Sequence, residues 1–261
     1  FENEIFVANL FKELGFLSPR TAFATINFRD EEYKFIFQET INKEFLENNN
    51  LVESSIYSGD ERLVFDSKFQ DSSNKYISLH KLDNRGWPKN NSSKILSSIY
   101  GLSLLNFLNI SHDINVPEHD LIDYYTITKE KKLEKYFEDF PIFDALSYAT
   151  DAFHNLSRDD RRFYHDYLNN KFVPIYYDGM SSLLNKDYKP LKNKLNEKET
   201  SLSNSALEGV SLVRKKLSDL DISSLKESLH RSGLIIEDDQ IIKIIENIFI
   251  NLDNIQNVDE K

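Results

Sequence analysis

The chain has 261 residues, 40% hydrophobic and 29% charged, a composition typical of a globular protein with a sizeable core. Its 43 acidic and 32 basic residues give a formal charge of -11, which disfavours nucleic acid as a partner because that affinity comes mainly from phosphate neutralisation. The absence of cysteine excludes disulfides, zinc–thiolate sites and a cysteine nucleophile.

No apolar run reaches the roughly 18 residues that a membrane-spanning helix needs, and no signal peptide is recognisable. The sequence therefore predicts no membrane span, and it predicts neither a compartment nor an oligomeric state. The chain starts at Phe1 inside a helical pattern, so we expect a domain truncated at its N-terminus.

Helical and strand-like patterns alternate along the first third of the chain. The expected elements are a helix over 2–14 capped by Gly15, a hairpin of 21–28 and 33–38 turning at 30–32, a short helix over 41–49 capped by Thr40, a strand over 62–66, and a polar loop over 67–92 with a turn at 84–88.

Helices dominate the remainder. The expected elements are a buried helix over 93–110, a helical stretch from Pro117 to about 138, a helix restarting at Pro141, a hairpin of 161–166 and 171–178, a solvated basic helix over 189–198, and helices over 202–219, 223–231 and 238–253, the last capped by Asp238 or Asp239. This order predicts an α+β fold in which a small antiparallel sheet part precedes a mainly helical part.

Acidic residues stand at both ends of the second expected hairpin. Asp159 and Asp160 precede its first strand, and Asp178 follows its second, in which Pro174 indicates an edge position or a bulge. The two ends of an antiparallel hairpin lie side by side, so Asp160 and Asp178 could bind one cation such as Mg²⁺. The plainer alternative is that these acids only end strands and cap turns.

Candidate catalytic groups lie just before this hairpin. His154 could act as a general base or orient one, Asp151 lies one helical turn earlier and could partner it, and Asn155 could bind a phosphate–metal complex. A half-buried histidine bonded to backbone and an asparagine that turns the chain are the structural alternatives.

Positive charge gathers at the same place. Arg158, Arg161 and Arg162 could steady phosphates, or they could neutralise the neighbouring acids. Glu39, at the end of the first hairpin, could lie in a cleft or cap the next helix. The sequence contains no GxSxG, P-loop, GxGxxG or HExxH motif.

Two blocks of the chain resemble the CotH family of atypical kinases, named for a spore-coat protein. Three short matches form the first block: Leu14-Gly15, Pro19-Arg20-Thr21 and Gln38-Glu39. The second is "DDRRFYHDYLNNKFVPIYYD" (159–178), with Asp160 in place of the family's asparagine, aromatic residues in the first strand and a proline before the final Asp178. The resemblance spans residues 4 to about 180.

The resemblance implies a two-lobed, protein-kinase-like fold that transfers the γ-phosphoryl group of ATP to a protein hydroxyl. It implies that Asp178 and Asp160 bind Mg²⁺ or Mn²⁺ and that Glu39 lines the nucleotide cleft, where Arg161 is our candidate phosphate ligand. The expected divisions of this single domain are the rest of the sheet lobe (1–66), a helical lobe with the metal-site hairpin (67–185) and a C-terminal helical subdomain (186–261).

Several family positions depart from the pattern. The family's catalytic aspartate falls on Asn155, which leaves the base open between His154, Asp151 and a lost function. The family's glycine reads Tyr33, and its lysine is missing near Ser58. The alternative function is therefore a non-catalytic, pseudokinase-like scaffold that binds an assembly partner instead of a protein substrate. A metal-dependent phosphate-ester hydrolase would explain the acids but not the layout of hairpin and glutamate.

Overall fold

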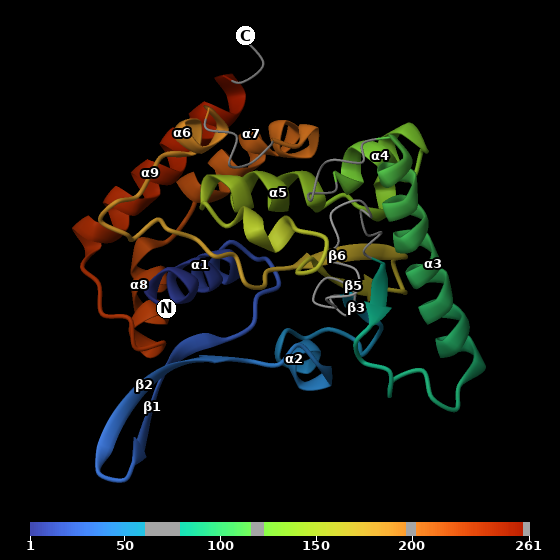
Figure 1. Cartoon of the computed structure of the whole chain (residues 1–261), viewed down its shortest axis with the longest axis horizontal. Helices are drawn as coiled ribbons and strands as arrows, with labels where there is room; N and C mark the ends of the chain where they lie inside the picture. Colours follow the sequence, from blue (N-terminus) through green and yellow to red (C-terminus); the bar gives the residue numbers. More distant parts are fainter. Residues whose placement is uncertain (61–78, 116–122, 197–201, 258–261) are drawn as a thin grey trace, which may run out of the picture.

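A computed structural model describes residues 1–60, 79–115, 123–196 and 202–257, and it shows an α+β fold (Figure 1). The α-helices of these residues are α1 (Glu2–Glu13), α2 (Lys43–Asn48), α3 (Ser92–Asn115), α4 (Tyr124–Glu130), α5 (Phe140–Ala149), α6 (Leu191–Asn196), α7 (Asn204–Ser218), α8 (Ile222–Arg231) and α9 (Asp238–Gln256). The strands are β1 (Thr21–Phe28), β2 (Glu31–Gln38), β3 (Ile56–Gly59), β4 (His80–Leu82), β5 (Arg162–Asp166) and β6 (Lys171–Ile175).

Four strands form an antiparallel sheet in the order β4-β3-β5-β6. The predicted hairpin of β5 and β6 is confirmed, and Pro174 lies on β6 at the edge of this sheet, where its missing N–H costs no ladder bond. The sequence did not indicate β3 or β4. Tyr57 of β3 pairs with Phe163 of β5, so the sheet joins segments more than a hundred residues apart.

The first hairpin, β1 with β2, forms a separate two-stranded sheet that extends from the body of the molecule (Figure 1). Its turn is Arg29–Asp30, where both residues have positive φ, so the turn lies one residue earlier than expected and Glu31 already belongs to β2. Ile26 and Phe35 lie on one exposed apolar face of this hairpin.

The largest core lies between α1 and the C-terminal helices. Phe6 and Phe11 of α1 are fully buried in one cluster with residues of α5, α7, α8 and α9. Gly15 has a φ of +85° at the end of α1, as its expected capping role requires. Gly209 of α7 lies against the backbone of Pro141 in α5, so the two helix backbones are in close contact. This packing unites the first and last segments of the chain.

A second core is mainly aromatic and lies under the four-stranded sheet. It contains Tyr57, Leu105, Leu108, Tyr124, Phe137, Phe140, Phe163 and Phe172. The Phe140 and Phe163 rings stack at a centroid distance of 5.7 Å, and the Phe137 and Phe172 rings stack at 4.9 Å. These contacts fix β5 against α5 and β6 against the segment that precedes α5, and so position the hairpin that carries the acidic residues.

The helix expected to be buried over 93–110 is only partly so. One side of α3 packs on the aromatic core through Leu105 and Leu108, while Leu96 is 67% exposed and Ile99 and Phe107 are also exposed. Apolar residues on every face of α3 therefore did not mean that every face of this helix is buried.

Other boundaries also differ from expectation. The helical stretch predicted to run to about 138 is broken after α4, because Lys132 has positive φ and a short 3₁₀ turn follows. Asn42, not Thr40, caps α2, and Glu237 forms the capping box of α9 in place of Asp238 or Asp239. The expected strand over 62–66 and the predicted helix start at Pro117 lie outside the described residues.

Candidate functional site

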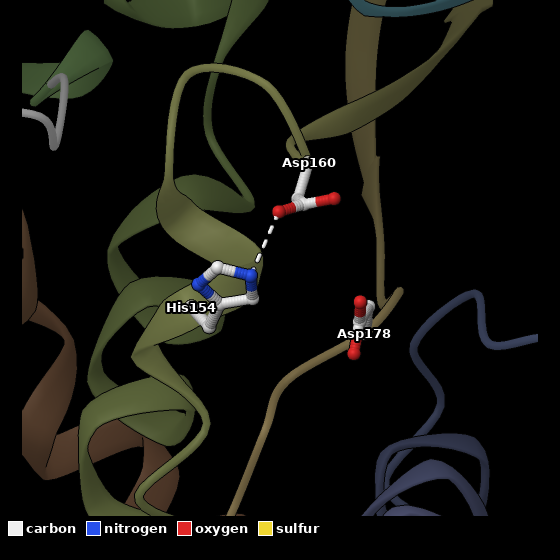
Figure 2. A group of neighbouring side chains, drawn as sticks. All are labelled: His154, Asp160 and Asp178. Atoms are coloured by element: carbon white, nitrogen blue, oxygen red, sulfur yellow. Dashed lines mark ion pairs between the residues drawn. The ribbon is translucent and has the colours of Figure 1, made fainter. Parts of the chain in front are cut away.

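The β5–β6 hairpin brings Asp160 and Asp178 to one place, as its strand ends predicted (Figure 2). Asp160 lies in the loop that enters β5, and Asp178 follows the end of β6. The Asp178 backbone is left-handed, with a φ of 44°, a conformation that aspartate adopts more readily than most residues. Both carboxylates therefore belong to the same mouth of one hairpin.

His154 joins these carboxylates from the 3₁₀ turn Phe153–Leu156, which follows α5. Its Nε2 atom lies 3.0 Å from Oδ2 of Asp160, and one donor atom from each of His154, Asp160 and Asp178 lies within 4.8 Å of the others. The His154 side chain is 38% exposed and that of Asp160 is 12% exposed. The group therefore opens to solvent on one side, where an ion can enter.

The charges of the group act on one another. The hydrogen bond to Asp160 raises the pKa of His154 above its usual value and outweighs the effect of burial. Burial raises the pKa of Asp178, and the Asp160 carboxylate raises it further, against the attraction of His154 and Arg162. Two neighbouring carboxylates and one imidazole, which is bonded to Asp160, thus form a site whose negative charge a bound cation would neutralise.

The loop that carries Asp160 is held on both sides. A Cβ atom on Gly59, at the end of β3, would lie 2.1 Å from the carbonyl oxygen of Arg158, so the loop backbone rests directly on this glycine. The Ser157 hydroxyl lies 2.7 Å from Oδ1 of Asp159 and 3.2 Å from Oδ2 of Asp160. These contacts orient the Asp160 carboxylate before any ligand binds.

A cavity of about 360 Å³ lies between the end of β2, the start of α2 and the four-stranded sheet. It is lined by Gln38, Glu39, Thr40, Ile41, Asn42, Asp83, Asn84, Arg162 and Tyr177. Arg162 follows Asp160 by two positions, and Tyr177 directly precedes Asp178. Both carboxylates therefore neighbour cavity-lining residues along the chain, and Arg162 lies close enough to Asp178 to act on its charge.

Glu39 lines this cavity and does not cap the next helix, because Asn42 caps α2. Its Oε1 atom lies 2.9 Å from Nη2 of Arg20 and accepts a 2.7 Å hydrogen bond from Asn48, and the backbone N–H of Arg20 donates to Oε2. Burial alone would raise the pKa of Glu39, but these hydrogen bonds lower it below its usual value. Glu39 thus lines the cavity as an ionised carboxylate that its hydrogen bonds hold in place.

Arg162, not Arg161, is the arginine of this cavity. Its guanidinium carbon lies 3.6 Å from the ring centroid of Tyr177, and its Nη1 atom lies 3.4 Å from Oδ2 of Asp83. Sequence reasoning named Arg162 only among several charges, and it missed Asp83 and Tyr177 because no motif surrounds them.

Arg161, predicted to bind the cofactor, points into the interior instead. Its side chain is 2% exposed, and its Nη2 atom lies 2.5 Å from Oδ1 of the buried Asp144. The guanidinium also lies over the rings of Tyr124 and Phe140 at 5.0 Å. Because β5 alternates its side chains between two faces, only one of the two adjacent arginines can face the cavity.

Asp151 does not partner His154, contrary to the expectation. Its carboxylate accepts a hydrogen bond from the Ser182 backbone N–H at 3.0 Å and lies 2.6 Å from Nζ of Lys194. Lys194 belongs to the basic helix that was expected to be solvated, yet it is 13% exposed. This pairing was not predictable, because Lys194 lies 43 residues away.

Asn155 is 1% exposed, and its Oδ1 atom lies 3.2 Å from the Ser147 hydroxyl of α5. It therefore takes part in the packing of the 3₁₀ turn on α5. Of the three candidate catalytic residues, His154 alone combines partial exposure with contact to the carboxylate pair.

No protein-family model and no curated protein matches this sequence. Within the described residues, no helix is both long enough and apolar enough to cross a lipid bilayer.

Proposed function

We propose that this protein is a CotH-like atypical kinase domain, which transfers the γ-phosphoryl group of ATP to a protein Ser or Thr hydroxyl with Mg²⁺ or Mn²⁺. The observation that carries the proposal is that Arg162, which lines the cavity with Glu39, also lies close enough to Asp178 of the Asp160–Asp178 pair to act on its charge. The two sequence blocks that resemble the family thus converge from separate parts of the chain.

The two carboxylates suit the implied ion. Carboxylates that open to solvent are the usual protein ligands of Mg²⁺, which keeps its other positions for water and phosphate oxygens. When bound, such an ion would neutralise charge on the phosphates. Asp160 and Asp178 would hold it, and the loop contacts with Gly59 and Ser157 keep Asp160 in place.

The cavity suits the nucleotide. Arg162 offers a guanidinium to the cavity and lies close enough to Asp178 to act on its charge, and arginine pairs well with phosphate oxygens. Glu39, held by Arg20 and Asn48, provides a rigid acceptor for donor groups of the base or ribose. Transfer would then depend on positioning and charge stabilisation, which dominate phosphoryl transfer in general.

A non-catalytic scaffold of the same fold is the second candidate. It is favoured by Asn155, which takes the place of the family's catalytic aspartate and is buried against α5. Such a pseudokinase would bind a nucleotide or a protein partner without transferring phosphate.

Calorimetric titration with Mg²⁺-ATP tests the proposal. We expect the wild-type protein to bind only when the metal is present. Asp178→Ala should abolish binding by removing an ion ligand, and Arg162→Ala should weaken it about tenfold by removing a phosphate contact. Asp219→Ala, at an exposed acid at the end of α7, is the control and should bind as the wild type does.

Absence of Mg²⁺-ATP binding to the folded wild type would overturn both the kinase and any nucleotide-binding scaffold. Binding without transfer of ³²P from labelled ATP to a mixture of acceptor proteins, or to the chain itself, would favour the scaffold.

A further inference from the structure

His154 faces the carboxylate pair through Nε2, the nitrogen that commonly binds metals. In Figure 2 the imidazole and the two carboxylates approach one another from three separate segments, the 3₁₀ turn, the loop before β5 and the segment after β6. Within the described part of the chain, the structure gives Asp178 no hydrogen bond and no ion pair. The Asp178 carboxylate, which could bind a metal ion, thus has no hydrogen-bond or ion-pair partner among these residues and lies beside the bonded pair of His154 and Asp160.

We propose that His154 is a metal ligand, and that the His154–Asp160–Asp178 centre takes a first-row transition ion such as Zn²⁺ or Co²⁺ in preference to Mg²⁺. The inference deepens the proposed function and rests on it for the position of the ion beside the nucleotide cavity.

The spacing of the donor atoms supports a shared ion. Ligands bound at about 2.0–2.2 Å lie about 3.3–3.6 Å from one another around a tetrahedral ion. The Nε2 atom of His154 and Oδ2 of Asp160 are already 3.0 Å apart, and the third donor atom lies within 4.8 Å of both. A shift of the Asp178 side chain by no more than about 2 Å therefore completes three ligands, and the open side leaves room for water or phosphate.

The identity of the donors decides the class of ion. Mg²⁺ prefers oxygen ligands, whereas imidazole suits Zn²⁺, Cu²⁺, Fe²⁺ and Ni²⁺. One imidazole in place of an oxygen ligand thus shifts the preference of the site towards the later first-row ions. The Ser157 hydroxyl, within 3.2 Å of Oδ2 of Asp160, would orient that carboxylate as an outer partner of the centre.

If His154 is a metal ligand, it cannot also be the general base of phosphoryl transfer. Nε2 bound to an ion cannot accept a proton from the acceptor hydroxyl. Because phosphoryl transfer relies mainly on positioning and on charge stabilisation, the proposed function does not depend on His154 acting as a base.

The test is metal titration of the whole protein without nucleotide, by calorimetry for Zn²⁺ and Mg²⁺ and by visible absorption for Co²⁺. The variants are His154→Gln and Asp178→Asn. The control is His230→Gln, which removes another partly buried histidine, on α8, away from the hairpin mouth. Thermal unfolding of each variant without metal confirms that it is folded.

We expect one Zn²⁺ per wild-type chain, bound at least about tenfold more tightly than Mg²⁺. His154→Gln should lower the Zn²⁺ affinity at least about tenfold and change the Mg²⁺ affinity less than about threefold. Asp178→Asn should weaken both ions, and the control should weaken neither. In wild-type protein labelled with ¹⁵N-histidine, Zn²⁺ should shift the His154 Nε2 resonance, which tests ligation even if His154→Gln does not fold.

Equal Zn²⁺ affinity of wild type and His154→Gln, or an unchanged His154 resonance, would overturn the inference. If Mg²⁺-ATP still binds in a way that needs Asp178, the proposed function survives that result. Conversely, Zn²⁺ binding through His154 in a protein that never binds Mg²⁺-ATP would support the metal centre and refute the kinase.

Discussion

Glu4 of α1 lies beside the segment that carries Asp178. The Tyr176 hydroxyl donates a 2.9 Å hydrogen bond to its Oε2 atom, and its Oε1 atom is buried without a hydrogen-bond partner. Burial raises the pKa of Glu4 to about 7, with a further contribution from Asp178. The fold thus favours the protonated, neutral carboxyl.

Part of the pH dependence of stability should therefore come from this residue. A carboxyl whose pKa is raised on folding stabilises the fold fully below its unfolded pKa, and this contribution is lost as the pH rises towards about 7. Glu4→Gln keeps an acceptor for Tyr176 and removes the charge. We expect the stability of Glu4→Gln relative to the wild type to rise between about pH 4.5 and 7. Above about pH 7 the difference should be constant, at no more than about 3 kcal/mol.

Urea unfolding of both proteins at pH 5 and pH 8 measures this difference. Glu2→Gln, at an exposed acid of the same helix, should show no such trend. A difference between Glu4→Gln and wild type that stays constant with pH would contradict the prediction.

Among the elements, β3 matters most to the site because Gly59 supports the loop before Asp160. A Cβ atom there would lie 2.1 Å from a backbone oxygen and 2.5 Å from the Asp159 Cα atom, so the loop must move. We expect Gly59→Ala to destabilise the protein by about 1–3 kcal/mol and to weaken metal binding by displacing Asp160. Gly86→Ala is the matched control, since nothing lies within 4 Å of its added Cβ atom.

Chemical denaturation measures the stability of each glycine variant, and calorimetry measures its metal affinity. Equal stability and metal affinity for Gly59→Ala and Gly86→Ala would show that the loop accommodates the methyl group.

The elements also show what could be predicted from the sequence. The β5–β6 hairpin was predictable because its strands are rich in aromatic and β-branched residues around the asparagines of the turn, and its geometry then placed Asp160 beside Asp178. The strand β3 was not, because four residues ending in glycine carry too short a pattern, and both of its partner strands are distant in sequence.

For single residues of the site, too, local chemical signals were predictable and distant contacts were not. His154 was found because histidine near acids is a recognisable chemical signal. Its true partner, Asp160, and the pairing of Asp151 with Lys194 depend on tertiary packing, which a local pattern does not contain. The opposite directions of Arg161 and Arg162 follow from strand alternation, but which one faces the core depends on Asp144 of α5.

For the whole molecule, the contact of α5 with α7 holds the largest core together. A Cβ atom on Gly209 would lie 1.9 Å from the carbonyl oxygen of Pro141. Alanine normally stabilises a helix by about 1 kcal/mol relative to glycine. Here we expect Gly209→Ala to lower stability by about 1–3 kcal/mol, because the helices must separate.

This loss should appear as a shift of one cooperative transition, because α1 and the C-terminal helices share that core. Thermal unfolding followed by calorimetry and by circular dichroism measures it. Two separate transitions, or a gain in stability, would contradict the prediction.

The packing of α1 against α8 also has a consequence for biosynthesis. Ser224 of α8 donates a 2.9 Å hydrogen bond to Glu13, 211 residues earlier in the chain. At about 5–20 residues per second, α1 leaves the ribosome roughly 10–40 s before the helix that covers it. During that interval its apolar face, including Phe6 and Phe11, lacks its native cover, so the nascent chain is a natural client for chaperones that bind exposed apolar segments.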